Sequence, residues 1–186
     1  MARIIVKNAR IAFPDVFEAT QYQNQGPWQY RATFLIDPSN PAKAEIDAAI
    51  KEVAKAKWGA KADAILPEIL IDKKACCFID GNRRAYNGFA GNWALTATRN
   101  QDAGRPAVVD RNKTPLTAQD GKIYSGAYVN GIVELWSQDN SYGKAIRATL
   151  VTVQFVKDGE SFGGAAPATA EGLDDLGDDF SDEDLI

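Results

Sequence analysis

The sequence contains no histidine. Histidine is the usual base of hydrolytic triads and a frequent zinc ligand, so this absence excludes Ser-His-Asp and Cys-His catalysis and imidazole metal sites. The chain has two cysteines, Cys76 and Cys77, which are adjacent. Two neighbouring thiols cannot complete a structural zinc site without other soft ligands, and a vicinal disulfide is strained. We therefore expect two reduced thiols on a strand, one of them buried, with no metal and no cofactor.

Long hydrophobic runs are also absent. The longest uncharged stretch covers residues 85–98 and contains several polar side chains, so no segment of the chain could cross a bilayer. At the N-terminus, Lys7 and Arg10 interrupt the first apolar residues before they reach the length of a signal peptide. We therefore expect a cytoplasmic protein that has no membrane partner.

Basic residues are missing from the last part of the chain. The whole sequence has a net charge of −4, which by itself argues against nucleic-acid binding. Residues 1–157, however, hold all 21 Lys and Arg and only 15 Asp and Glu, which gives +6. Residues 158–186 hold 10 acidic residues and no basic one, which gives −10. The chain is therefore a basic body followed by an acidic segment.

This division predicts three regions: a domain over 1–157, a flexible Gly/Ala-rich linker over 158–170 and an acidic, disordered tail over 171–186. Eight of the last sixteen residues are acidic. Such a segment repels itself and buries too little apolar surface to offset its ordering entropy. The apolar residues among the acids favour docking or self-competition over a purely solvating role. The residues we expect to bind a partner are Asp178, Asp179, Phe180, Asp182, Glu183, Asp184, Leu185 and Ile186.

The body has the pattern of a mainly β protein with one helix. From Pro41 to Trp58, apolar residues recur on one helical stripe, and Gly59 follows as a stop signal. Alternating or β-branched runs predict strands over 4–13, 28–36, 75–79, 92–99, 107–109, 124–137 and 144–156, and residues 137–143 form a hairpin turn between the last two. This arrangement favours a small β-barrel with a capping helix. The alternation also assigns Trp28, Tyr30, Phe34 and Trp93 to the core.

Basic and aromatic side chains interleave along the body. Proteins hold a single nucleic-acid strand by stacking its bases on aromatic rings and pairing its phosphates with Lys or Arg. Tyr124 and Tyr128 share one strand face about 13 Å apart, which allows each to support a base. The expected stacking residues are Tyr86, Tyr124, Tyr128 and Trp136. The expected phosphate contacts are Arg31, Arg83, Arg84, Arg99, Arg105, Arg111, Lys144 and Arg147.

Two alternatives stay open at this point. A metal-dependent nuclease needs clustered carboxylates, and the candidates are Asp110, Asp120, Glu134 and Asp139, whose spacing is not diagnostic. A protein-interaction module that binds no DNA, and whose acidic tail imitates DNA, is the second alternative.

Six segments in order resemble a family of bacteriophage and prophage proteins that was long grouped only as a domain of unknown function. The segments are 13–17, 30–36, 57–59, 105–110, 124–130 and 153–160. Members of that family are single-stranded-DNA-binding proteins with an OB-fold. The acidic tail is also similar to those of bacterial and phage single-strand binders, although it ends in Leu185-Ile186 and not in Pro-Phe.

The resemblance implies a mainly β, OB-fold-like barrel with one capping α-helix and a non-enzymatic role in phage DNA replication or recombination. We expect the body to coat and protect single-stranded DNA without regard to sequence, in the cytoplasm of the infected bacterial host. We expect the tail to compete with DNA and to recruit replication or recombination proteins. Whether the protein forms a homo-oligomer stays open.

Overall fold

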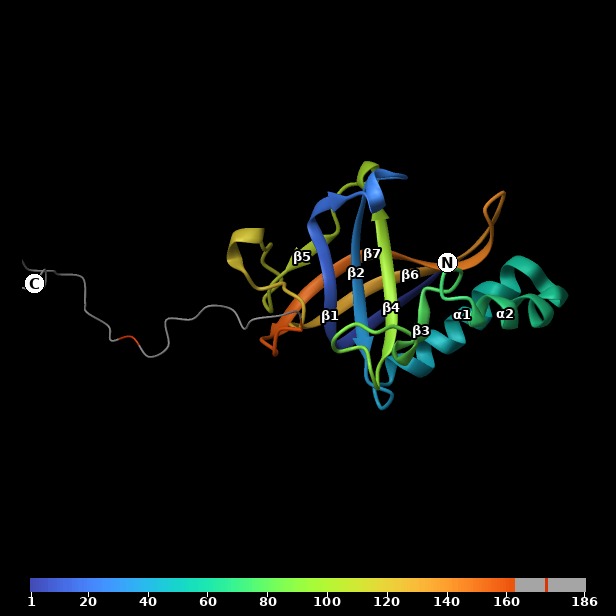
Figure 1. Ribbon diagram of the computed structural model, residues 1–186, viewed down its shortest axis with the longest axis horizontal. Helices are drawn as coiled ribbons and strands as arrows, with labels where there is room; N and C mark the ends of the chain where they lie inside the picture. The colour runs from blue at the N-terminus through green and yellow to red at the C-terminus, as the bar shows by residue number, and fades with distance from the viewer. Residues whose placement is uncertain (163–172, 174–186) are drawn as a thin grey trace, which may run out of the picture.

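The computed structural model describes residues 1–162 and residue 173 (Figure 1). The predictions for the rest of the linker and for the acidic tail fall outside the described residues. The described residues form two α-helices, α1 (Ala42–Trp58) and α2 (Ala62–Ile71). The same residues form seven strands, which are β1 (Ala2–Thr20), β2 (Gln29–Ile36), β3 (Phe78–Asp80), β4 (Trp93–Asn100), β5 (Ala107–Val109), β6 (Tyr128–Asn140) and β7 (Gly143–Lys157).

The strands form one sheet that closes on itself. Their order is β3-β4-β2-β1-β6-β7-β5, and β4 also pairs with β7. This last pairing is parallel and joins Thr98 to Thr149, whereas β1–β2, β2–β4, β1–β6 and β6–β7 are antiparallel. Five strands therefore close into a ring, with β3 and β5 as short additions to its edges. The predicted mainly β, OB-like fold is confirmed.

Strand β1 extends well beyond its predicted end at Phe13. Its pairing with β2 shifts register between Ala12 and Asp15, and Phe13 has a positive φ of 50°. Such a bulge leaves a residue out of the hydrogen-bond ladder, so it tolerates Pro14, which has no N–H to donate. The sequence pattern stopped the strand at this proline because a proline usually ends one.

Apolar side chains from all five ring strands fill the interior. Phe34 is fully buried, and its ring lies against Gly131, where a Cβ atom would come within 2.4 Å of a ring carbon. Glycine is therefore required at this point of β6. The core prediction is confirmed for Tyr30 and Phe34, and Trp93 is half-buried and stacked on a neighbouring ring. It is wrong for Trp28, which is 52% exposed because it precedes β2 and lies in the connection from β1.

The predicted helix is present as α1. Its buried stripe includes Ile46, Ile50 and Val53, and it is tied to β6 by a hydrogen bond from Ser137 Oγ to the carbonyl of Val53 at 2.8 Å. Helix α2 was not predicted; Pro67, a residue type that usually interrupts helices, lies inside it. No helix in the described part of the chain is long and apolar enough to span a membrane.

Candidate nucleic-acid interface

A groove of about 1170 Å³ crosses the outer face of β2 and β4 and reaches β6 and β7. Tyr22 and Pro27, in the connection between β1 and β2, line one side of it. Asn140 and Tyr142, at the tip of the β6–β7 hairpin, also line it. The groove is therefore a strand surface bordered by two loops that are far apart in the sequence.

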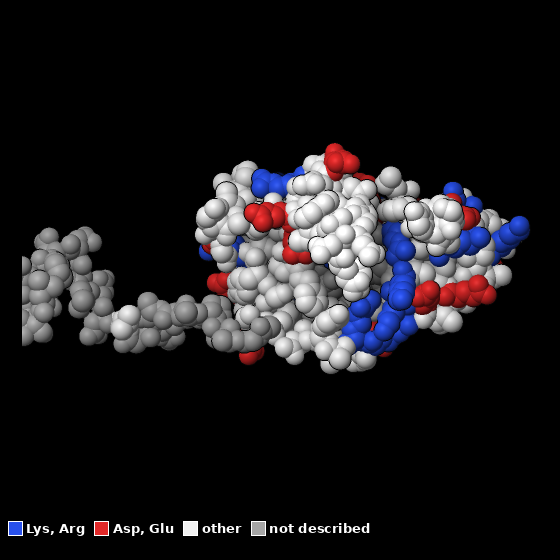
Figure 2. All heavy atoms as spheres, turned by 45° about the horizontal axis from the view of Figure 1, so that its top comes forward, with Lys and Arg blue, Asp and Glu red and all other residues white. Residues whose placement is uncertain are grey.

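The charged side chains that line the groove all have the same sign. None of its lining residues is Asp or Glu, and Figure 2 shows a band of Lys and Arg on this face beside a hollow. Walls of low dielectric constant concentrate the field of such a cluster, which raises the local concentration of anions. The basic residues are Arg31, Lys73, Lys74, Arg84, Arg99 and Arg147.

Two of these cations are held in place by the chain itself. Arg99 donates to the carbonyls of Gly104 and Ala103 at 2.8 and 2.9 Å. Arg147 donates to the carbonyl of Lys74 at 2.7 Å and to an amide oxygen on β6 at 3.3 Å. Each guanidinium has five N–H donors, so these contacts fix its orientation and leave donors for a ligand.

Among the described residues, no side-chain hydrogen bond or ion pair is made by Arg31, Arg84, Lys73 or Lys74. Arg31 Nε is buried and has no hydrogen-bond partner there. A buried donor without a partner costs roughly 1–3 kcal/mol. Because this atom is out of contact with solvent, an anion entering the groove would meet the other N–H donors of Arg31.

Aromatic side chains lie on both bordering loops. Tyr142 is 91% exposed and Tyr22 is 66% exposed. Trp136 also lines the groove; it is half-buried on β6, in register with Arg147 of β7. The sequence interpretation missed Tyr22, Tyr142 and the two lysines that follow α2. An aromatic residue in the predicted hairpin turn was a usable signal for Tyr142, because burial cannot explain a ring at a turn tip.

The structure brings five of the predicted contact residues into this groove and leaves seven outside its lining. Those inside are Arg31, Arg84, Arg99, Trp136 and Arg147; those outside are Arg83, Tyr86, Arg105, Arg111, Tyr124, Tyr128 and Lys144.

Several residues outside the groove are occupied by the protein's own polar groups. The Arg83 guanidinium donates to the last carbonyls of α2, those of Leu70 and Ile71, at 3.4 and 2.5 Å. Arg111 donates to a carbonyl of β7 at 2.6 Å, and Lys144 lies 3.7 Å from a carboxylate oxygen of Asp139. Arg105 is exposed in the connection that leads to β5.

Tyr124 and Tyr128 contact the residues that follow β7. The Tyr124 hydroxyl accepts from the N–H of Gly159 at 3.0 Å and lies 2.9 Å from the carbonyl of the same residue. Burial, with the Asp158 carboxylate nearby, raises the pKa of this hydroxyl. Lys157 lies 4.7 Å from the centre of the Tyr128 ring, and Arg10 covers the same ring at 5.3 Å.

Residues 158–162 continue from β7 along the body, and we call them the C-terminal latch. Arg10 donates to the carbonyl of Glu160, and its guanidinium lies 4.1 Å from the centre of the Phe162 ring. Asn87 donates to the carbonyl of Phe162 at 2.6 Å. This part of the predicted linker is therefore packed on the body, beside the loop 81–92 that also contributes Arg84 and Phe89 to the groove.

The four carboxylates considered for a nuclease lie in separate local structures. Asp110 and Asp120 accept backbone N–H groups in their own turns, Glu134 pairs with Arg3 at 2.7 Å, and Asp139 accepts from an indole N–H of α1 at 3.0 Å. Within residues 1–162, no group of three or more His, Cys, Asp or Glu side chains could hold a metal ion.

The ring of five strands and the cationic groove on its face define an OB-like protein with an anion-attracting surface. The chain belongs to the family described as "Enterobacter phage Enc34, ssDNA-binding protein", whose model matches residues 2–186. The family resemblance seen in the sequence is confirmed.

Individual relatives agree with this assignment. "Putative protein p50" of Acyrthosiphon pisum secondary endosymbiont phage 1 is 46% identical over 176 residues, which cover 94% of each chain. The single-stranded DNA-binding protein of bacteriophage Enc34, solved in complex with ssDNA, is 26% identical with a TM-score of 0.71, over 87% of this chain and 89% of that one. Bacteriophage T7 gp2.5 shares the fold, with 16% identity and a TM-score of 0.55 over 97% of this chain and 100% of that one.

Proposed function

We propose that this protein binds single-stranded DNA without sequence preference in the groove across β2, β4, β6 and β7. The observation that carries the proposal is a groove with six basic lining residues, no acidic one and an exposed tyrosine on each bordering loop. OB-folds bind oligonucleotides on this kind of strand face and with the adjoining loops. Family membership and the Enc34 protein solved with ssDNA support the same ligand.

In this proposal basic side chains contact the phosphates and aromatic side chains contact the bases. Arg31, Arg84 and the two lysines after α2 have free donors for phosphate oxygens, and Arg99 and Arg147 supply fixed positive charge. Bases stack on Tyr22, Trp136 and Tyr142. Because every base has a π face, this mode of binding tolerates any sequence. It requires no bond to be made or broken, so the protein acts as a binder and not as an enzyme.

The acidic segment regulates this site in our proposal. The charge of −10 on residues 158–186 is opposite to that of the groove, and the latch fixes its start beside the loop that supplies Arg84 and Phe89. The segment competes with weakly held ligands such as duplex DNA, and displacement by single-stranded DNA frees it to recruit replication or recombination proteins. The protein thereby coats and protects DNA exposed during phage replication in the host cytoplasm.

The test of the groove is fluorescence anisotropy of labelled oligo-dT at several salt concentrations, with a duplex control. If four or five phosphates are neutralised, log K should fall against log salt with a slope of roughly −3, since each contributes about −0.7. Arg31→Ala should weaken binding, whereas Arg105→Ala, a matched loss of one exposed arginine outside the groove, should change it little. Equal effects of the two variants would contradict the groove assignment.

The test of the acidic segment compares the full chain with a chain that ends at Phe162 and so keeps the latch. Truncation should tighten binding, and duplex affinity should rise most. Absence of binding by both chains would leave the protein-interaction module as the working function. Degradation of labelled DNA with magnesium or manganese, abolished by chelation, would favour the nuclease.

A further inference from the structure

Phe13 has an unusual backbone conformation for a bulky residue. Its φ is 50°, in the left-handed region, and its side chain is 47% exposed. Left-handed backbone at an aromatic residue costs conformational energy and persists only where the surroundings impose it. In this conformation about half of the Phe13 side chain stays exposed.

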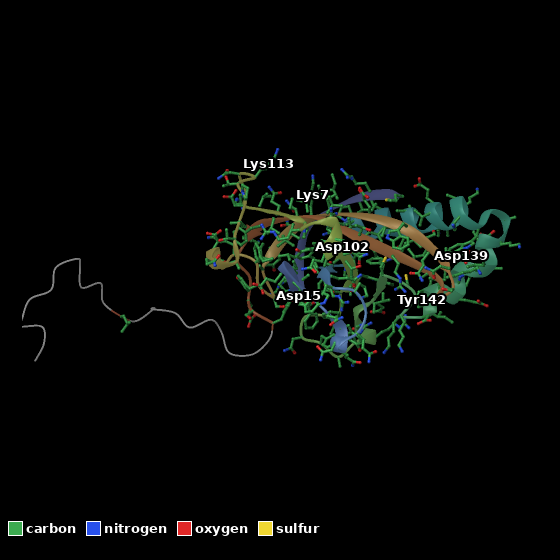
Figure 3. All side chains as sticks on the ribbon, turned by 90° about the horizontal axis from the view of Figure 1, so that it is seen from above. Lys7, Asp15, Asp102, Lys113, Asp139 and Tyr142 are labelled. Atoms are coloured by element: carbon green, nitrogen blue, oxygen red, sulfur yellow. The ribbon has the colours of Figure 1, made fainter. Side chains whose placement is uncertain are left out.

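The bulge in β1 is what presents the ring to solvent. The β1–β2 register shifts between Ala12 and Asp15, and the N–H of Phe13 donates to Ser125 Oγ at 3.0 Å. Bulges of this kind redirect a side chain and recur next to functional sites. In the view of Figure 3, Asp15, which follows the bulge, and Tyr142 of the β6–β7 hairpin are labelled on the same side of the molecule.

The exposed ring belongs to a three-ring cluster that reaches the groove. The centre of the Phe13 ring lies 5.0 Å from that of Tyr86, in an edge-to-face arrangement, and 6.1 Å from that of Phe89. Tyr86 is 49% exposed, whereas Phe89 is buried and lines the groove. Arg84, two residues before Tyr86, lines the groove as well. The two exposed rings therefore continue the groove's aromatic and basic surface.

The loop that carries Tyr86 is held from its other side. Asn87 donates to the carbonyl of Phe162, and a Cβ on Gly88 would lie only 2.4 Å from the Phe162 ring. Phe89 and Asn92 close the loop with backbone hydrogen bonds at 3.2 and 3.1 Å. These contacts hold the loop that carries Tyr86 in one conformation. A rigid aromatic side chain loses little conformational entropy when a base stacks on it.

We propose that Phe13 and Tyr86 form a second stacking platform, which takes bases of the strand after it leaves the groove. The inference rests on the proposed function and extends it, because it lengthens the footprint of single-stranded DNA past the groove. Continuity with the groove through Phe89 and the adjacent Arg84 favour DNA bases as the occupant. Apolar residues of the acidic segment, which begins beside this loop, are the competing occupant that the test must separate.

The experiment measures affinity against oligonucleotide length with the full chain. Oligo-dT from about 4 to about 16 nucleotides covers the site sizes of single OB folds. Tyr86→Leu and Phe13→Gly should bind the shortest oligonucleotide like the unaltered protein and bind the longest about tenfold more weakly, which is the effect of losing one stacked base. Ile71→Ala, an exposed apolar residue on α2, is the control and should follow the unaltered protein at every length.

Phe13→Gly also distinguishes a role of Phe13 in DNA binding from a role in stability. Glycine adopts the left-handed conformation without strain. The strain relieved at this position should offset the loss of the ring contacts, so the midpoint of thermal unfolding should stay within a few degrees of that of the unaltered protein. A lower midpoint with unchanged affinity for long oligonucleotides would give Phe13 a structural role and overturn the platform.

Two further arms separate the remaining outcomes. Arg31→Ala should weaken binding at every length; if it does so while Tyr86→Leu has no effect, the platform fails and the groove stands. If Arg31→Ala also has no effect, the groove itself fails. A labelled peptide of residues 171–186 whose binding requires Tyr86, while long oligonucleotides do not, would assign the platform to the acidic segment.

Discussion

The groove and the surface around the C-terminal latch both combine basic and aromatic side chains, yet their chemistry differs. In the groove, Arg31 and Arg84 make no side-chain hydrogen bond among the described residues, and no acid lies in the lining. Around the latch, Arg10 lies against two aromatic rings and donates to backbone carbonyls, and Tyr124 is bonded to Gly159. Arg31 and Arg84 are therefore available in the groove, whereas Arg10 and Tyr124 are already engaged at the latch.

This difference decides which surface a polyanion should choose. A phosphate entering the groove gains donors that the described residues of the protein do not use. A phosphate approaching the latch has to replace existing hydrogen bonds and meets the carboxylates of Asp158 and Glu160. Each exchange of one hydrogen bond for another contributes little net free energy. The availability of donors therefore matters more than the local density of arginine.

The largest effect should come from removing three groove cations together. Arg31, Lys73 and Lys74 replaced by alanine should weaken oligo-dT binding about 100-fold, or about 3 kcal/mol, at about 1 kcal/mol for each contact. The salt slope should fall by about 2. The matched control removes Arg105, Lys113 and Lys122, which lowers the net charge equally. Equal losses in the two triple variants, measured by anisotropy, would show that only total charge matters.

Tyr142→Ala should weaken binding about tenfold, because stacking contributes roughly 1–3 kcal/mol per base. Stability should not change, since the side chain is 91% exposed. Tyr142→Trp keeps an aromatic face and should retain the affinity. Quenching of tyrosine fluorescence by oligo-dT that is smaller in the alanine variant would confirm the contact. An alanine variant with full affinity would remove the hairpin tip from the binding surface.

Tyr124→Phe tests the occupied surface. It should leave oligo-dT affinity unchanged and lower the free energy of unfolding by about 1 kcal/mol, the usual net contribution of one hydrogen bond. Urea denaturation gives the stability and anisotropy gives the affinity. A loss of oligo-dT affinity with an unchanged free energy of unfolding would show that Tyr124 contacts DNA.

The same hydroxyl gives an alkaline pH dependence. Because its pKa is raised in the folded protein, the folded state keeps this proton longer than the unfolded chain does. Its contribution to stability is therefore complete below the ordinary tyrosine pKa of about 10 and is lost as the pH rises towards the raised value. Urea titrations above pH 9 should show a shallower decline for Tyr124→Phe than for the unaltered protein.

The smallest effect concerns the two thiols in the groove lining. Burial raises the pKa of both Cys76 and Cys77, so little reactive thiolate forms near pH 8. A disulfide reagent should label them slowly in the folded protein and rapidly in denaturant, and bound oligo-dT should add little protection. Rapid labelling of the folded protein would show that the groove floor opens far more than its buried residues indicate.

Sequence patterns predicted what depends on neighbours along the chain. The stripe of Ile46, Ile50 and Val53 identified α1, and alternation located β2, β4, β6 and β7 well enough to suggest a barrel. The charge division isolated the basic body. Arg31, Arg99 and Arg147 reached the groove as predicted contacts because they lie in or next to strands whose outer face forms it.

Sequence patterns could not predict which group each side chain contacts in the folded protein. Arg83 and Tyr86 are three residues apart, yet one caps α2 and the other stands in an aromatic cluster. Tyr124 contacts Gly159, 35 positions away in the chain. Tyr22 and Tyr142 lie on loops, where alternation carries no information about exposure. Which arginine and lysine donors stay without a partner depends on the contacts that form when the sheet closes.

The pairing that closes this sheet also determines when the binding surface comes into existence. Thr98 and Thr149 are the residues that join β4 to β7, and both line the groove. They are far apart in the chain, and contacts of such large sequence separation make folding slow. The groove floor therefore includes the β4–β7 junction of the ring, which exists only once these two strands have met. During refolding, affinity for single-stranded DNA should return with this closure, after the β6–β7 hairpin and the helix α1 have formed.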